Sequence, residues 1–140
     1  MNSSLSSRPY IAAYTLLRVV MGLNFVMHGV VRLPKLDGFR SWMVKLFADS
    51  VLPSGLVSAW ASVLPFVELG IGVLLLAGLS TFRASVAGAV VMGALVTGTC
   101  LLEKWDLVAS QMMYAAWFVA LVAFVDHDKW SVDGLRATRS

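Results

Sequence analysis

The sequence predicts an all-α integral membrane protein: a four-helix bundle with an amphipathic interfacial helix between its first and second spans. Hydrophobic residues make up 59% of the 140 residues and charged residues only 14%, against about 45–50% and about 25% in ordinary soluble domains. A soluble chain of this length could not bury so much apolar surface. Four apolar stretches are long enough to cross a bilayer, and none alternates like a barrel strand, so each is expected to be helical.

The four predicted spans cover residues 10–31, 57–79, 84–102 and 107–125. Short connections join the last three spans, so these should pack as antiparallel neighbours. An even number of spans places both termini on the same side of the membrane. We expect one membrane domain over residues 1–140.

The connection between the first two spans is long and has its own helical pattern. Asp37 is a good N-cap, and a stripe of apolar residues follows at helical spacing. The stripe consists of Phe39, Trp42, Met43, Leu46 and Phe47. A short helix over residues 37–49 is therefore expected in the membrane interface, with its apolar face toward lipid and its end near Pro53.

Charge and cysteine content exclude several classes of function. The 11 Lys and Arg residues are scattered along the chain and leave a net charge of only +3, which argues against a nucleic-acid partner. The single cysteine, Cys100, excludes a disulfide within the chain, and no C-x-x-C motif supports thiol–disulfide exchange. Lys and Arg divide evenly between the two membrane faces, so they do not orient the protein. A cytoplasmic location of both termini is adopted as the expectation.

Two ionisable residues, Arg18 and Glu68, lie near the middle of the first and second spans. A charge at that depth costs about 2.5–3.5 kcal/mol on insertion scales, so each needs a partner. Counting about 1.5 Å per residue from the expected span ends puts the two at similar depth. We therefore predict an Arg18–Glu68 ion pair, which either fastens two helices together or handles a proton or ligand.

A second polar group is expected near the membrane face that carries the interfacial helix. Its members are Asn24, His28, Gln111, Tyr114 and Trp42, with Thr99 and Cys100 at similar height. An imidazole gains and loses a proton near neutral pH. His28 could thus bond a quinone carbonyl in an apolar cleft and exchange a proton with it. Alternatively, His28 satisfies a backbone carbonyl at the helix end.

The segment from Asp126 to Asp128, with Asp133 beyond it, contains candidate metal ligands. A calcium loop would need an oxygen ligand at the fifth position and glycine at the sixth, where this chain has Trp130 and Ser131. We therefore expect this segment to be a solvated cap after the last span. No metal, haem or flavin site is expected.

The third span carries small residues at every fourth position. They are Ser85, Ala89, Gly93 and Thr97. Such a seam lets helix backbones approach closely in lipid. Its partner could be another helix of this chain or a second protomer.

Three motifs, in chain order, resemble the DoxX family of small bacterial membrane proteins. The first comprises Leu16-Leu17-Arg18, Gly22, His28-Gly29 and Arg32, where the family usually has Lys at the last position. The second is the run from Glu68 to Leu79, followed by Thr81 and Arg83. The third is the closing segment Lys129-Trp-Ser-Val-Asp133-Gly-Leu135. Asn24 and the Asp126–Asp128 run are not expected features of the family.

The resemblance implies a bacterial cytoplasmic-membrane protein similar to the membrane subunit of thiosulfate:quinone oxidoreductase. Arg18, His28 and Glu68 are the family residues present here. The implied role is a redox-linked, quinone-interacting subunit that receives electrons from a partner protein. A non-catalytic accessory or assembly subunit of a larger membrane complex, or a homo-oligomer, is the alternative, and enzymatic activity is left open. A transporter has less support, because the spans show no inverted repeat.

Overall fold

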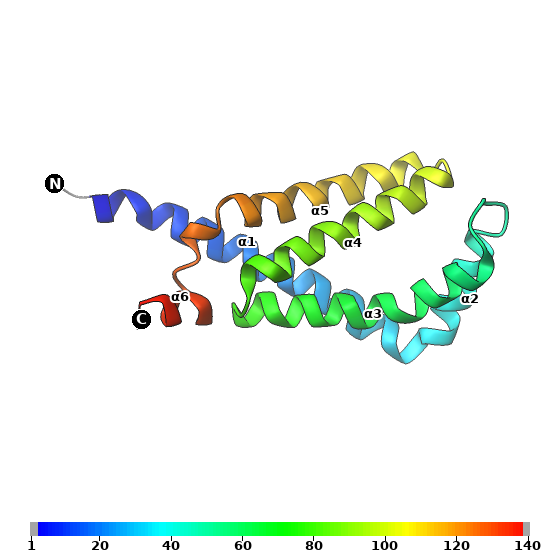
Figure 1. Cartoon of the computed structure of the whole chain (residues 1–140), viewed down its shortest axis with the longest axis horizontal. Coiled ribbons are helices and arrows are strands. Elements are labelled where there is room, and N and C mark those ends of the chain that lie inside the picture. The colour runs from blue at the N-terminus through cyan, green and yellow to red at the C-terminus, as the bar shows by residue number, and fades with distance from the viewer. Residues whose placement is uncertain (1–2, 139–140) are drawn as a thin grey trace.

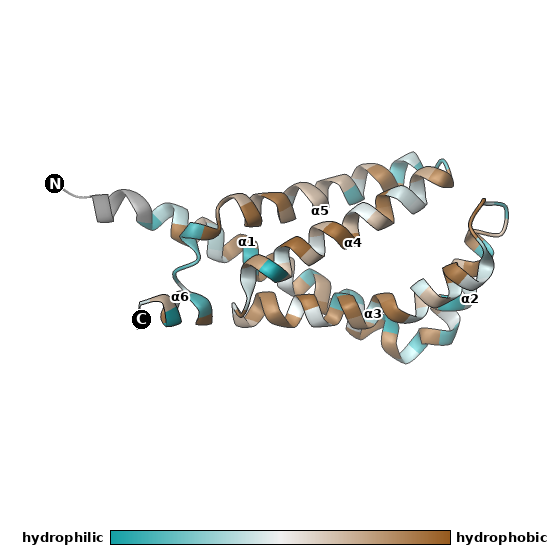
Figure 2. Cartoon of the chain, in the orientation of Figure 1, coloured by the Kyte–Doolittle hydropathy of each residue, from teal (hydrophilic) through white to brown (hydrophobic). Residues whose placement is uncertain are grey.

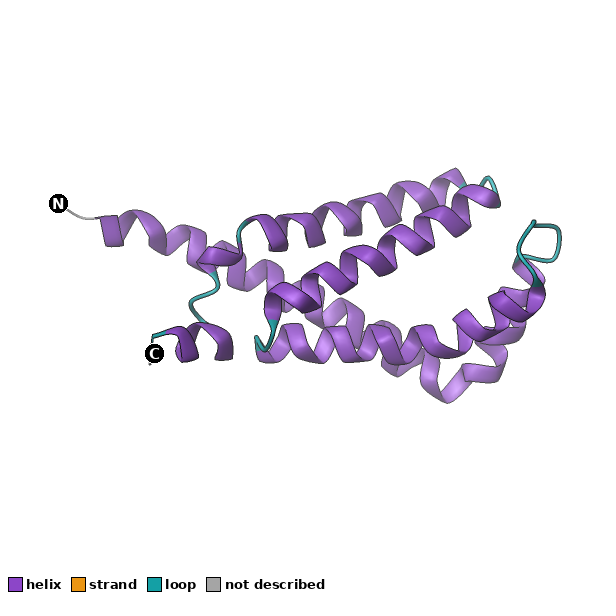
Figure 3. Cartoon of the chain, in the orientation of Figure 1, coloured by secondary structure: helices purple, strands orange, loops and turns teal. Residues whose placement is uncertain are grey.

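The computed structural model describes residues 3–138, and every element in that range is helical (Figure 3). The four long helices are α1 (Ser3–Arg32), α3 (Ser54–Ala77), α4 (Thr81–Leu101) and α5 (Trp105–Ala123). The short elements are η1 (Leu33–Lys35), α2 (Leu36–Leu46), η2 (Val125–His127) and α6 (Val132–Ala137). The first two and last two residues of the predicted domain lie outside the described range.

The predicted fold class is confirmed. Four helices are long and apolar enough to cross a membrane, with α1 and α2 counted together through η1. Apolar residues run along α3, α4 and α5, whereas hydrophilic residues gather near α6, in α2 and at the α4–α5 turn (Figure 2). This distribution is typical of a multi-pass membrane protein.

The long helices form two antiparallel pairs, α1 with α3 and α4 with α5. Near the termini the pairs are joined, and there Tyr14 of α1 donates a hydrogen bond of 3.2 Å to the carbonyl of Leu121 on α5. Toward the opposite end the α4–α5 pair separates from α3 (Figure 1). The bundle is therefore closed at the end that carries the termini and open at the end that carries α2.

Glycines allow α1 and α3 to approach closely. A Cβ atom on Gly72 would lie 2.5 Å from the backbone nitrogen of Val26, and one on Gly29 would lie 2.6 Å from the carbonyl oxygen of Pro65. Both contacts are with backbone, which cannot move aside as the end of a side chain can. In lipid, this kind of close approach supplies packing that the hydrophobic effect does not.

The sequence predicted that the apolar face of α2 would be turned toward lipid. In the structure this face packs on α3 instead. Met43 and Phe47 are buried against Val57 and Ala61 of α3. The reason is the length of α1: it ends at Arg32, beside the middle of α3, so the first half of α3 would otherwise lack a neighbour on that side. Helix α2 covers it.

The small-residue seam of α4 meets other helices of the chain only at its first residues. Ser85 is buried and Ala89 is half-buried, but Gly93 and Thr97 are exposed. The closest approach on α4 is made instead by Gly88, against the ring of Phe118 on α5. In the second half of the seam, Gly93 has open space beside it, whereas Thr97 borders the cavity between the two helix pairs.

Replacing Gly72 with alanine should destabilise the bundle by about 1–3 kcal/mol, because the new methyl group overlaps the α1 backbone. Gly70 is the matched control: a Cβ there meets nothing within 4 Å, so Gly70→Ala should be neutral or slightly stabilising through helix propensity. Unfolding in mixed micelles, followed by circular dichroism, measures both. Equal effects of the two substitutions would contradict the close α1–α3 contact.

Candidate functional site

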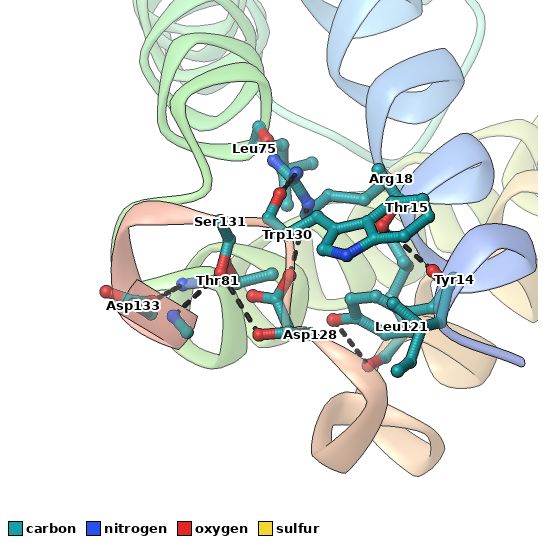
Figure 4. Close-up of polar contacts among 12 residues, drawn as sticks. Tyr14, Thr15, Arg18, Leu75, Thr81, Leu121, Asp128, Trp130, Ser131 and Asp133 are labelled. Carbon is teal, nitrogen blue, oxygen red and sulfur yellow. Dashed lines mark hydrogen bonds and ion pairs between the residues drawn. The ribbon is translucent and has the colours of Figure 1, made fainter. Parts of the chain in front are cut away.

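Arg18 is buried at the closed end of the bundle, where its guanidinium joins three segments (Figure 4). Its Nε atom lies 3.3 Å from Asp128 Oδ1. Its NH2 group donates to the carbonyl of Trp130 at 2.9 Å, and NH1 donates to the carbonyl of Leu75. The predicted Arg18–Glu68 ion pair is wrong, because the partner of Arg18 is Asp128.

The error has a geometric cause. Arg18 lies beside Leu75, and Glu68 is seven residues earlier on α3, roughly 10 Å away along the helix. The predicted depths assumed that both helices begin at the membrane surface, whereas α1 is displaced along α3. Asp128 was expected in a solvated cap, but only 7% of its surface is exposed. The chain after α5 folds back against the closed end of the bundle, which places this carboxylate beside Arg18.

The segment after Asp128 seals the turn between α3 and α4. Asp133 accepts a hydrogen bond of 2.8 Å from the backbone N–H of Thr81, the first residue of α4, and donates its own N–H to the carbonyl of Gly78 at 3.0 Å. Ser131 caps α6 by accepting from the N–H of Gly134 at 2.9 Å. The closing motif noted in the sequence therefore attaches the segment after α5 to the α3–α4 turn, far from the open end.

Glu68 forms the second buried polar centre and is 1% exposed. Arg32 NH1 donates to Glu68 Oε2, and His28 Nδ1 lies 3.6 Å from Glu68 Oε1. Arg32 follows His28 by four residues, and so occupies the same face of α1 one turn later. Arg32 is thus the partner that the buried carboxylate requires.

A cavity of about 560 Å³ lies between the two helix pairs at the open end. It contains the site residues that the sequence predicted for this face: Asn24, His28, Trp42, Gln111 and Tyr114. Glu68 also lines it, but Arg18 does not. Arg32, Phe39 and Phe47, which were not predicted for this site, also line the cavity, as does Trp60.

Two walls of the cavity carry hydrogen-bonding groups, and the rest is mostly apolar. On the α1–α3 wall the side chain of His28 is 41% exposed, and its Nε2 atom remains for a ligand because Nδ1 faces Glu68. On the α4–α5 wall Thr99 Oγ1 donates to Gln111 Oε1 at 2.7 Å. The Thr99 hydroxyl also lies 3.0 Å from the carbonyl oxygen of Leu95, so the Gln111 amide can offer either its oxygen or its NH2 group to a ligand.

Aromatic side chains build a third wall from α2. The guanidinium carbon of Arg32 lies 4.8 Å from the centre of the Phe39 ring. Phe39 in turn stacks on Trp42, with ring centres 6.0 Å apart and planes 27° from parallel. The position of Arg32, four residues after His28, was the sequence signal that could have placed Arg32 beside Glu68 with His28.

The two polar centres are separated by apolar packing. Between the levels of Arg18 and Glu68 the buried residues include Met21, Ile71 and Leu75. A proton relay from Glu68 to Arg18 therefore has no polar intermediate among the described residues. Proton exchange at His28 and Glu68 would take place through the cavity itself.

Within the described residues, no group of three or more His, Cys, Asp or Glu side chains could hold a metal ion. Asp128 is engaged by Arg18 and Asp133 by Thr81. Of the candidate ligands in the segment after α5, Asp128 and Asp133 therefore stabilise the fold.

Comparison with known families gives one match. The sequence model of the DoxX family matches residues 13–99, a segment that includes Arg18, His28, Arg32 and Glu68. Searches of curated proteins and of solved structures gave no match.

Removal of one member of the Arg18–Asp128 pair should cost about 3–5 kcal/mol, because it leaves a buried charge without a partner. Arg18→Met combined with Asp128→Asn should cost less than the sum of the two single changes. Arg18→Met combined with Glu68→Gln is the control and should be additive. Unfolding in micelles measures all five variants. Coupling of Arg18 to Glu68, and none to Asp128, would overturn the assignment.

Proposed function

Since the chain belongs to the DoxX family, we propose that it is a redox-linked membrane subunit that binds a quinone in the cavity at the open end. A bound quinone would supply the electron chemistry, taking up two electrons and two protons to become a quinol. The electrons would come from a partner protein. The proposal also places the protein in a bacterial cytoplasmic membrane with both termini in the cytoplasm, so that the cavity opens on the opposite side.

One observation carries the proposal: a mostly apolar cavity of about 560 Å³ with hydrogen-bonding groups on two of its walls. Ligand sites are commonly about 300–1,000 Å³, mostly apolar, with a few placed polar groups. A quinone ring is flat and carries carbonyl oxygens at opposite edges. His28 on α1 and Gln111 on α5 are suited to bond one oxygen each, with Phe39 beside the ring.

The polar wall supports proton handling at one atom. Protonated His28 holds a proton at Nε2 that it can donate to a carbonyl oxygen. Glu68 Oε1 lies 3.6 Å from Nδ1 and keeps the imidazole ring oriented. Arg32 in turn neutralises Glu68 when His28 has given up its proton. His28 is partly exposed, so it can be reprotonated from the mouth of the cavity.

Alanine in place of His28 should weaken binding of a quinone analogue roughly 10–100-fold, because a charge-assisted hydrogen bond is worth about 1.5–3 kcal/mol. His127→Ala is the matched control, since His127 lies in η2 at the other end of the bundle. Titration of purified protein in nanodiscs measures the affinity. If the unsubstituted protein shows no saturable binding of the quinone analogue, the proposal is wrong.

A second candidate function is an accessory subunit without chemistry of its own. It is favoured by the outward face of α4 at Gly93, which is exposed and offers a close approach to a helix of another chain. In that case Gly93→Leu should abolish co-purification with a larger complex, while the isolated chain shows no quinone turnover. Gly70→Leu is the control, because a Cβ atom on Gly70 of α3 meets nothing within 4 Å. Turnover by the isolated chain would exclude this candidate.

A further inference from the structure

The two ends of the bundle differ in net charge. At the open end basic and acidic side chains are equal in number. They are Arg32, Lys35, Arg40, Lys45 and Lys104 against Asp37, Asp49, Glu68, Glu103 and Asp106. At the closed end, within residues 3–138, the basic side chains outnumber the acidic ones. They are Arg8, Arg18, Arg83, Lys129 and Arg136 against Asp126, Asp128 and Asp133. The surplus of positive charge in the described chain therefore lies at the closed end.

The surplus is concentrated at the surface of the closed end, because two of the three carboxylates there are engaged. Asp128 is buried against Arg18, and the carboxylate of Asp133 accepts a hydrogen bond from the backbone N–H of Thr81. The other four cations are exposed, and no ion pair between described residues engages them. They are Arg8, Arg83, Lys129 and Arg136. An anionic partner at this end would meet these cations with the exposed carboxylate of Asp126 as the main opposing charge.

Helix α6 turns a mixed basic and apolar face away from the bundle. On its inner side Gly134 is buried and Asp133 bonds to the α3–α4 turn. At 3.6 residues per turn, Val132, Leu135 and Arg136 lie on the opposite side of the helix, and all three are exposed. The two residues before Ser131, which caps the helix, are exposed as well. We call the resulting set the α6 face: Lys129, Trp130, Val132, Leu135 and Arg136.

The α6 face lies at the level where the spans end. Arg18 donates one hydrogen bond to the carbonyl of Trp130 and another to the carbonyl of Leu75, which lies two residues before the end of α3. The N–H of Asp133 donates to the carbonyl of Gly78, in the turn between α3 and α4. Tryptophan side chains at this level of a membrane protein lie in the head-group region of the bilayer. The α6 face is therefore within reach of lipid head groups.

The composition of the α6 face indicates the chemistry of its partner. Its two cations favour an anion, and its three apolar side chains favour an apolar environment beside that anion. The edge of an anionic bilayer offers both, because phosphates lie at the surface and acyl chains begin directly below them. An acidic protein surface would satisfy the cations and leave Trp130, which is 60% exposed, and Leu135, which is 59% exposed, without apolar contacts.

We propose that the α6 face is a binding surface for anionic phospholipid, with its two cations at the phosphates and its apolar side chains against the adjoining acyl chains. Arg83, in the first turn of α4, extends the positive surface beyond α6. The site lies at the opposite end of the bundle from the proposed quinone cavity and does not depend on it. Because the same segment supplies Asp128 to Arg18, lipid bound here also stabilises the closed end.

Trp130 allows a direct test, because it belongs to the α6 face. The full chain is reconstituted in phosphatidylcholine vesicles that contain a minor fraction of either brominated phosphatidylglycerol or brominated phosphatidylcholine. The Trp130 signal is the difference between the unsubstituted protein and Trp130→Phe. Brominated phosphatidylglycerol should quench it more strongly. Lys129→Gln and Arg136→Gln should each lower this preference about fivefold, because each removes a cation near the anionic surface.

Lys45→Gln and Lys104→Gln are the matched controls. Both lysines are exposed, and no ion pair between described residues engages them, but they lie at the open end, where the charges balance. Neither control should change the lipid preference at Trp130. Equal quenching by the two brominated lipids in the unsubstituted protein would overturn the inference. An equal loss of preference in the controls would also overturn it, because the effect would then come from the net charge of the whole protein.

A salt titration of the unsubstituted protein tests the inference without any substitution. Exposed charges are screened as the salt concentration rises, so the preference of Trp130 for brominated phosphatidylglycerol should fall. Quenching by brominated phosphatidylcholine should stay constant, since it reports the apolar contact alone. A preference that does not depend on salt would contradict a role for the two cations. Because no quinone is present, the result is separate from the outcome at the cavity.

Discussion

The ion pair between Arg32 and Glu68 is the interaction on which the open end of the molecule depends. A carboxylate that is 1% exposed needs a permanent cation, and Arg32 can supply it only if α1 ends beside the middle of α3. The glycines at the α1–α3 contact permit the same alignment. Once α1 ends there, α2 must cover the rest of α3, and the cavity lies between that cover and the α4–α5 pair.

The same alignment explains the closed end. With Arg32 beside Glu68, Arg18 falls beside Leu75, at the end of α3, where no acidic residue of a spanning helix is within reach. The segment after α5 supplies Asp128 and then continues to the α3–α4 turn. Arg18 at the middle of α1 and Arg32 at its end therefore each have a buried acidic partner, Arg32 from a neighbouring span and Arg18 from a connecting segment.

The fold class and the site differ in how far the sequence predicts them. Apolar runs of spanning length are a local property, so the four helices could be predicted. The shared face of Asn24 and His28 follows from helical spacing, and both line the cavity. The Arg18 partner could not be predicted in this way, because hydropathy does not show how far one helix is displaced along another. Asp128 lies outside the spans, so a search for partners within the membrane passes over it. The direction of α2 depends on the same displacement.

The partners of Arg18 also set an order of events during synthesis. Its bond to the carbonyl of Trp130 joins residues 112 positions apart, and Asp128 is made only shortly before Trp130. From insertion of the first helix until the last span has left the ribosome, this arginine has neither partner. Until then its guanidinium can bond to the carbonyl of Leu75 on α3, but its charge lacks the acidic partner that it has in the folded protein. The closed end is completed only after the segment that follows α5 has been made.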